Sequence, residues 1–265
     1  MNKMNLSKKL LVALGVGLLA TGALFADQKG TDIMQKVYDV AKPDYSHSAV
    51  EMDLISSNGD VQKRMVEEWG MNDSNDLAST VMIFRSPSTV KDTRFLQVEN
   101  EGDQADSKWI YLPALRTVRR IASSEGDKSF MGTDATYDDM ETREVAEDTH
   151  TYIKDETVNG YDCYVVKSVA VDMGDSQYSQ RISWVDKNSY VPVKIEMYDK
   201  SDDALYKVLT VNELKQIKGY WIPTDNSMEN VQSGHSTDIK ILQIELDKPL
   251  SGNMFTSNFL KTGRI

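Results

Sequence analysis

Hydrophobic and polar residues alternate along most of the chain after residue 44. Val50, Met52 and Leu54, for example, are separated by the acidic residues Glu51 and Asp53. Because successive side chains of a strand point to opposite faces, this two-residue period predicts strands with one buried face and one polar face. Further strands are predicted over residues 62–69, 80–85, 93–99, 109–112, 115–121, 151–158, 161–171, 177–186, 191–198, 204–216, 220–230 and 236–246.

The connections between the predicted strands are short and rich in turn-forming residues. The dipeptide Asn58-Gly59, between the first two strands, is a strong hairpin signal. Tight turns between consecutive strands predict an antiparallel meander. A sheet of about 11 strands does not stay flat. We therefore expect a mainly β (α+β) fold, in which a strongly curved antiparallel sheet forms an open, incomplete β-barrel.

One helix is predicted before the first strand. Residues 30–42 place Ile33, Val37 and Val40 on one stripe of a helix, and Pro43 ends it. An amphipathic helix needs an apolar surface to pack against. We expect this helix, together with short helices later in the chain, to cover the concave face of the sheet.

Residues 1–26 have a different pattern from the rest of the chain. Three lysines precede an uncharged apolar run over residues 10–25, and Ala26 comes before Asp27. This pattern is typical of a secretory signal peptide that is cleaved after Ala26. The run is shorter than the roughly 18–20 residues of a membrane-spanning helix, which disfavours a membrane anchor. We expect a secreted protein whose residues 27–265 form a single domain.

The charge balance argues against one class of partner, and the cysteine count excludes two structural features. Without residues 1–26 the chain has 27 basic and 41 acidic residues, a net charge of −14. Nucleic acid needs a basic surface, so no nucleic-acid partner is expected. Cys163 is the only cysteine, which excludes an intrachain disulfide and a multi-cysteine metal site. We expect a monomer that needs no cofactor.

The least generic stretch of the chain covers residues 109–141. Arg116, Arg119 and Arg120 follow an aromatic strand. They either form ion pairs that tie this strand to neighbouring elements or make a rim for an anionic head group, where the planar guanidinium is effective. Phe130-Met131 then stands between two glycines, and we expect this pair to be exposed in a loop.

Four acidic residues in the same stretch are candidates for a cation site: Asp134, Asp138, Asp139 and Glu141. Hard cations bind several carboxylate oxygens, but the spacing does not match a calcium-binding loop. A structural role explains these residues better than a cation site does. Asp134 suits the cap of a short helix that begins at Ala135, and the next two acids complement the positive end of its dipole.

The common motifs of nucleophilic and nucleotide-dependent enzymes are missing from the sequence. An enzymatic alternative remains, in which Asp138 and Asp139 act with a bound cation or with His150. The reaction would be the hydrolysis of a lipid ester, as in a phospholipase. The histidines are far apart in the sequence, so a position on the surface or at a strand edge explains His150 better than a catalytic role does.

Large and flexible apolar residues occupy many of the expected inward positions. Methionine adapts to irregular partners, so these residues could line a cavity for an acyl chain or fill a packed core. Periodicity alone does not separate the two possibilities. The candidate lining residues are Ile33, Val37, Val40, Met52, Leu54, Met82, Phe84, Phe95, Trp109, Tyr111, Phe130, Met131, Trp184, Met197 and Trp221.

Two consecutive motifs resemble the outer membrane lipoprotein-sorting protein family, whose members are periplasmic relatives of the lipoprotein carrier LolA. They are W-I-Y-L-P-A-L-R-T-V-R-R-I at residues 109–121 and K-S-F-M-G-T-D-A-T-Y-D-D-M at residues 128–140. Supporting pieces follow at residues 184–186, 193–199 and 219–223. The resemblance therefore covers most of the chain after residue 26.

The resemblance implies an open β-barrel with helices over its mouth and an apolar cavity that takes acyl chains of lipoproteins or related lipids. It also implies an inner-membrane partner, a transporter of the RND or ABC type. In this interpretation the protein is a carrier in outer membrane biogenesis. Ile33, Val37 and Val40 would form a movable lid with Phe130-Met131. A filled scaffold within an envelope complex is a third possibility.

Overall fold

The computed structural model describes residues 21–101 and 104–264. Most of the predicted signal peptide, residues 1–20, therefore lies outside the described residues. Helix α1 (Thr21–Tyr38) continues across the predicted cleavage position and ends before Pro43. The predicted range of 30–42 is wrong at both ends, and Val40 lies two residues beyond the last helical residue. Among the described residues, no helix is long and apolar enough to cross a membrane.

Thirteen strands follow α1 in the described part of the chain and form one antiparallel sheet. The predicted mainly β fold is confirmed. The sheet has slightly more strands than the about 11 that we expected from the sequence. The strands are β1 (Tyr45–Ile55), β2 (Val61–Asn72), β3 (Ala78–Ser86), β4 (Arg94–Val98), β5 (Ser107–Leu112), β6 (Thr117–Ile121), β7 (Asp148–Val158), β8 (Tyr161–Ala170), β9 (Tyr178–Asp186), β10 (Pro192–Asp199), β11 (Leu205–Ile217), β12 (Tyr220–Asn230) and β13 (His235–Leu246).

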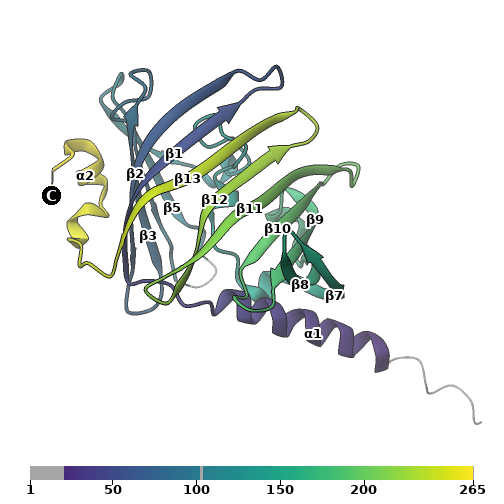
Figure 1. The fold of residues 1–265 in the computed structure, drawn as a ribbon. Coiled ribbons are helices and arrows are strands. Elements are labelled where there is room, and N and C mark those ends of the chain that lie inside the picture. Colours follow the sequence, from purple (N-terminus) through teal and green to yellow (C-terminus); the bar gives the residue numbers. More distant parts are fainter. Residues whose placement is uncertain (1–20, 102–103, 265) are drawn as a thin grey trace, which may run out of the picture.

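The sheet consists of two meanders that meet at β1 and β13. Its strand order is β6-β5-β4-β3-β2-β1-β13-β12-β11-β10-β9-β8-β7, so the first strand pairs with the last. β6 and β7 are its two edges. Figure 1 shows the sheet bent into a strong curve. Because the edges do not pair within the described residues, the barrel is incomplete, as predicted.

The chain passes from β6 to β7 through residues 122–147, which we call the crossing segment. It contains three short 3-10 helices, η1 (Ser123–Glu125), η2 (Asp138–Met140) and η3 (Val145–Glu147). In Figure 1 this teal segment lies inside the curve, on the concave side of the sheet. The remaining short helices are η4 (Met173–Asp175), η5 (Gly252–Met254) and α2 (Ser257–Thr262).

Different parts of the chain cover the two faces of the sheet. On the concave side, residues of β1 to β6 form an apolar cluster with the crossing segment. On the convex side, Trp69, Val81 and Leu96 pack against Phe259 and Leu260 of α2. Figure 1 shows α2 outside the curve. The first meander therefore has an apolar layer on both faces.

Helix α1 covers the far end of the concave side. Ile33 is 5% exposed and packs against Val166 of β8 and Val185 of β9. At the end of the helix, Tyr38 Oη donates a hydrogen bond of 2.8 Å to Glu144 in the crossing segment. The helix and the crossing segment thus lie side by side and together cover the concave face, as expected for its short helices.

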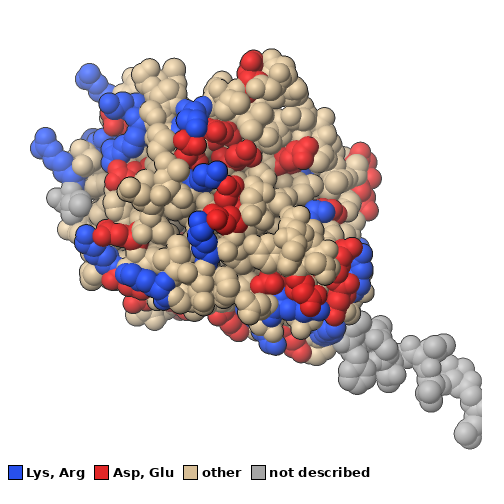
Figure 2. Space-filling view, in the orientation of Figure 1, with Lys and Arg blue, Asp and Glu red and all other residues tan. Residues whose placement is uncertain are grey.

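The part of the convex face that α2 leaves uncovered is polar. Lys63 pairs with Glu51 across β1 and β2 at 2.7 Å, and Lys240 pairs with Asp225 across β12 and β13 at 2.9 Å. Figure 2 shows acidic and basic side chains interspersed over this face. The alternation in the sequence therefore corresponds to an apolar concave face and a charged convex face.

Candidate functional site

The concave side of the first meander holds an aromatic cluster around Phe130 of the crossing segment. The centre of its ring lies 4.9 Å from that of Phe95 and 5.8 Å from that of Tyr137. Phe130 is 2% exposed, so the prediction of an exposed aromatic residue in this loop is wrong. The chain after β6 folds back into the curve of the sheet, where burial of an apolar ring is favourable.

A buried arginine holds the loop that follows Phe130. Arg64 of β2 is 7% exposed, and its Nη1 donates a hydrogen bond of 2.6 Å to the carbonyl oxygen of Met131. Arg64 lies two residues before the buried Val66 and therefore points to the same, concave face. Burial lowers the pKa of the Arg64 guanidinium. The arginine thus fixes the crossing segment to β2.

Asp134 ties the crossing segment to β13 on the other side of the curve. Its Oδ2 accepts a hydrogen bond of 2.7 Å from Thr237 Oγ1 and lies 2.7 Å from His235 Nδ1. The helix expected from Ala135, with Asp134 as its cap, is wrong, because the nearest helix is η2 and begins at Asp138. The carboxylate of Asp134 is occupied by a tertiary contact that the local sequence does not reveal.

A buried charge pair joins the crossing segment to β11. The side chains of Lys207 and Asp139 are 3% and 7% exposed, and Nζ lies 3.0 Å from Oδ2. Tyr178 Oη donates a further hydrogen bond of 2.8 Å to Asp139 Oδ1. Burial raises the pKa of Tyr178, so its hydroxyl remains a donor. A buried pair of this kind is stable only while both partners are present.

The other candidate cation ligands have separate surroundings. Glu141 binds the buried Lys108 of β5. The backbone N–H of Asp138 donates to the Gly126 carbonyl oxygen at 3.0 Å, and burial raises the pKa of the Asp138 carboxyl. Within residues 21–101 and 104–264, no group of three or more His, Cys, Asp or Glu side chains is arranged to hold a metal ion. The carboxylates of Asp134, Asp139 and Glu141 thus bind different partners.

The structure does not bring together the residues considered for hydrolysis. His150 Nδ1 lies 2.8 Å from Ser168 Oγ, and its Nε2 lies 3.0 Å from the Val145 carbonyl oxygen. Burial lowers the pKa of its imidazole. Asp139 is bound to Lys207 instead. The geometry offers no support for a catalytic set of Asp138, Asp139 and His150, and that role stays a prediction.

The three arginines within residues 109–141 have different surroundings. Arg119 Nη1 forms an ion pair of 2.6 Å with Glu125 Oε2. Arg120 Nη2 lies 3.5 Å from Ser107 Oγ, and Arg116 occupies the turn before β6 with φ of +52°. The ion-pair interpretation therefore describes Arg119. A head-group role for the three residues stays a prediction.

The predicted lining residues separate into groups. Trp109 and Tyr111 pack near α2 on the convex side, because the buried Ile110 between them takes the inward position. Trp184 belongs to a further cluster with Cys163. The residues in or beside the Phe130 cluster are Met52, Leu54, Met82, Phe84, Phe95, Phe130 and Met131.

The remaining predicted lining residues lie in the second meander or in α1. Ile33 and Val37 belong to the cluster beneath α1, apart from the Phe130 cluster. The two parts of the expected lid therefore cover different ends of the concave face. Met197 of β10 is 4% exposed, whereas Trp221, at the start of β12, and Val40 are partly exposed.

A pocket of about 330 Å³ opens on the concave side, next to the crossing segment. Met82 and Met140 form its apolar part and also pack against the Phe130 cluster. Glu68, Gln97 and Glu99 form its polar part. Burial raises the pKa of Glu68 to about 7. The pocket thus combines an apolar floor with a carboxyl group that titrates near neutral pH.

Sequence reasoning missed Arg64, Glu68 and Lys207. The alternation contained a signal for the first two, because they flank the buried Val66 at intervals of two residues on β2. A charged residue at an inward position is costly unless it has a partner or a function. For Lys207 no local signal exists, since its partner Asp139 is 68 residues away in the sequence.

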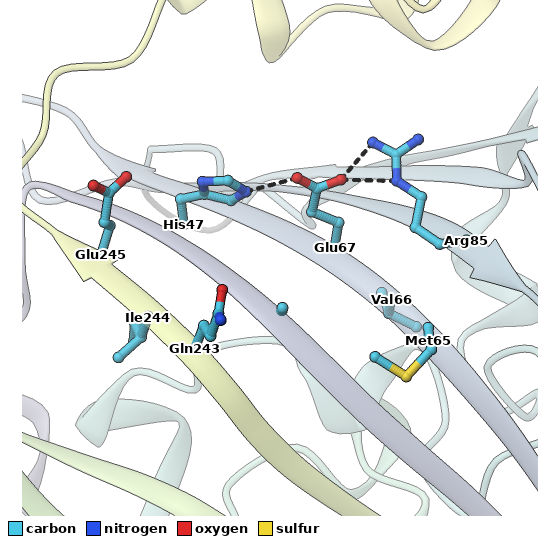
Figure 3. Close-up of a pocket in the computed structure, with 9 residues that line it drawn as sticks. His47, Met65, Val66, Glu67, Arg85, Gln243, Ile244 and Glu245 are labelled. Atoms are coloured by element: carbon cyan, nitrogen blue, oxygen red, sulfur yellow. Dashed lines mark hydrogen bonds and ion pairs between the residues drawn. The ribbon is translucent and has the colours of Figure 1, made fainter.

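A second, larger hollow of about 590 Å³ lies on the convex face, over β13, β1 and β2. Figure 3 shows His47, Glu67 and Arg85 in a row along one side of it. His47 Nε2 lies 2.8 Å from Glu67 Oε1, and Arg85 Nε donates to Glu67 Oε2 at 2.8 Å. The His47 ring stacks on Trp69 at 4.9 Å. The polar groups of these side chains bond to one another. The hollow is therefore bordered by a surface network, on the face opposite the apolar lining.

A family model and two solved structures resemble the chain, and both structures share its fold over nearly their whole length. A family model described as "Uncharacterized protein" matches residues 76–262. A protein domain from Vibrio parahaemolyticus, described as an outer membrane lipoprotein-sorting protein, is 32% identical, and the match covers 89% of this chain and 99% of that one with a TM-score of 0.82. A DUF1329 family protein from Desulfovibrio piger is 28% identical, with coverages of 89% and 99% and a TM-score of 0.83.

A more distant structure shows the same fold. A LolA superfamily protein from Nitrosomonas europaea is 17% identical, with coverages of 87% and 98% and a TM-score of 0.65. At this identity the likeness concerns the fold alone. No protein with curated annotation matches the chain.

Proposed function

The chain belongs to the outer membrane lipoprotein-sorting protein family, and on this premise we propose that it is a periplasmic carrier. It binds acyl chains of lipoproteins or lipids on the concave side of the sheet and moves them between the envelope membranes. One observation carries the proposal: the middle of the curve is lined by Met52, Leu54, Ile239 and Ile241, beside an open pocket.

The contrast between the two faces supports an acyl ligand. Shielding each methylene group from water contributes about 0.8 kcal/mol, so even one chain supplies substantial affinity on an apolar surface. The exposed convex face carries ion pairs between Lys63 and Glu51 and between Lys240 and Asp225, and the hollow on that face is bordered by charged side chains such as Glu67 and Arg85. A ligand with long apolar chains therefore favours the concave side.

The remaining parts of the proposal concern location and partners. The predicted signal peptide, cleaved after Ala26, would deliver residues 27–265 to the periplasm as a single domain. An inner-membrane transporter of the RND or ABC type would supply the cargo. The Vibrio parahaemolyticus relative is described as a lipoprotein-sorting protein, which favours an acylated protein or lipid as that cargo.

Binding of a fluorescent fatty-acid analogue tests the proposal, together with native mass spectrometry of lipids that co-purify with the protein. Thr80→Trp places a bulky ring at a pocket-lining position and should weaken binding of the analogue at least tenfold. Thr210→Trp is the matched control, because Thr210 is three residues after the inward-pointing Lys207 and faces the convex side. Equal binding by both variants and the wild type would contradict an acyl site in this pocket.

A further inference from the structure

The pocket beside the crossing segment has an excess of negative charge. Glu68 and Glu99 lie in its wall. Asp106 reaches the same wall through Gln97, whose Nε2 donates to Asp106 Oδ2 at 2.7 Å. Burial raises the pKa of the Asp106 carboxyl to about 6. Three carboxyl groups thus converge on one small pocket.

The cations near this pocket are already engaged. Lys108 is 5% exposed and binds Glu141. Arg64 donates to the Met131 carbonyl oxygen. Glu99 is partly satisfied, because its Oε2 accepts a hydrogen bond of 2.8 Å from the Ala78 N–H. Among the described residues, Glu68 has no such hydrogen bond and no ion pair.

The shape of the pocket adds a second requirement for its ligand. Met82 and Met140 line it and also pack against the Phe130 cluster, and Met82 is the cross-strand neighbour of Glu68. A molecule that fills the pocket therefore meets apolar side chains next to an unpaired carboxyl group. Such a surface suits an apolar chain that ends in a hydrogen-bond donor with positive charge.

We propose that this pocket binds the protonated primary amine of an acylated molecule, with Glu68 as its counter-ion. This inference rests on the proposed carrier function and specifies the polar end of the cargo. A charge-assisted hydrogen bond between ammonium and carboxylate is strong where water is partly excluded. The amine supplies the positive charge that the wall of the pocket lacks.

The proposal has a consequence for pH dependence. A bound ammonium group favours the ionised form of Glu68, so binding releases a proton and affinity rises between pH 6 and pH 8. An alkyl amine of the lysine type keeps its proton throughout this range, whereas a peptide α-amino group, with a pKa of about 7.7–8.0, loses part of its proton toward pH 8. The charged groups in the wall of the pocket or in contact with it are Glu99, Asp106, Lys108 and Glu141.

The test compares ligands that differ only at the amine. Lysophosphatidylethanolamine and its N-acetyl derivative, with the same acyl chain, compete with the fluorescent fatty-acid analogue. An acylated peptide with a free or acetylated N-terminus forms a second pair, so the two arms distinguish a lipid head group from a peptide terminus as the source of the amine. We expect the free amine of at least one pair to bind about tenfold more tightly, as for a hydrogen bond to a charged group.

Substitution of Glu68 makes the test specific. Glu68→Gln should abolish the tenfold preference for the free amine, whereas Glu51→Gln, which removes a carboxylate from the convex face, should preserve the preference. Equal binding of free and acetylated amines by the wild type, with the analogue still bound, would overturn the amine site and leave the carrier function standing. Failure of the analogue itself to bind would overturn both.

Discussion

Two parts of the chain cover the concave face, and they are held in different ways. The crossing segment, over the first meander, buries Phe130 and is fixed by charged contacts at Arg64, Asp134 and Asp139. Helix α1, over β7 to β9, is held mainly by apolar packing of Ile33. Its polar contacts, such as Lys36 Nζ to Tyr190 Oη at 3.2 Å, lie at exposed positions.

The difference indicates which cover opens. Lifting the crossing segment would leave Lys207 and Arg64 buried without partners, which is costly. Lifting α1 exposes apolar surface that cargo can cover again. The exposed polar groups of α1 can replace their present hydrogen bonds by hydrogen bonds to water at little cost in free energy. We therefore expect α1 to be the movable part and the crossing segment to be a fixed wall. This revises the expected lid, in which Phe130 and α1 move together.

The largest expected effect tests the anchoring of the crossing segment. Asp139→Asn leaves the Lys207 ammonium buried without its counter-ion, which should lower the free energy of unfolding by about 3–5 kcal/mol. Urea denaturation measures the change. The matched control is Asp155→Asn, which removes an exposed pair with Lys187 of 3.0 Å and should cost about 0–1 kcal/mol. A cost for Asp139→Asn no larger than that of the control would remove the distinction between the two covers.

An intermediate effect is expected from Glu68, in the pocket beside the crossing segment. Its pKa is raised to about 7 by burial, so the folded state holds this proton more tightly than the unfolded chain does. Stability from this group is present at low pH and is lost as the pH rises through about 7. Glu68→Gln should therefore unfold like the wild type at pH 5 and be about 1–2 kcal/mol more stable at pH 8.

Denaturation curves across this pH range check the sign of the effect. The slope that remains in the variant should come from Asp106, whose pKa is raised to about 6. Glu51→Gln, on the convex face, should leave the pH dependence as it is in the wild type. A Glu68→Gln variant that is less stable than the wild type at pH 8 would show that this carboxylate has a favourable partner in the folded protein.

The smallest effect on global stability is expected at the contact between α1 and β7. A Cβ atom at Gly30 would lie 2.8 Å from the Tyr152 backbone nitrogen and 2.9 Å from the His150 carbonyl oxygen. Gly30→Ala improves helix propensity by up to about 1 kcal/mol but pushes the helix off the strand, so global stability should change by less than about 1 kcal/mol.

Hydrogen exchange separates the local effect of Gly30→Ala from the global one. Amide protons of α1 should exchange faster in the variant, while those of the crossing segment keep their protection. Gln35→Ala, at an exposed position of the same helix, should change neither. Faster exchange in the crossing segment would mean that the two covers open together.

The strands were predictable because burial acts at every second residue. Met52 and Leu54 of β1 are each 5% exposed, and the residues between them are not buried, as the alternation predicted. The helix was less predictable, since its ends depend on capping and on Pro43 rather than on periodicity. The exposed position predicted for Phe130 failed because glycines on either side say nothing about what the loop folds against.

The candidate site was only partly predictable. The motif at residues 128–140 indicated the family and thus the curved sheet. It did not indicate that Asp134 binds Thr237 or that Asp139 binds Lys207, because these partners are 103 and 68 residues away. The acids therefore looked like one cluster in the sequence, although Asp134, Asp139 and Glu141 each bind a different partner in the structure.

By itself, the sequence determined the class of fold. The two-residue period and the short turns require an antiparallel sheet, and a sheet with so many strands has to curve. Only the tertiary structure decided what lies inside the curve. Arg64 and Glu68 occupy equivalent inward positions on the same strand, but Arg64 meets the Met131 carbonyl oxygen and Glu68 faces a pocket. That outcome depends on the path of the crossing segment, which long-range contacts set and local periodicity does not encode.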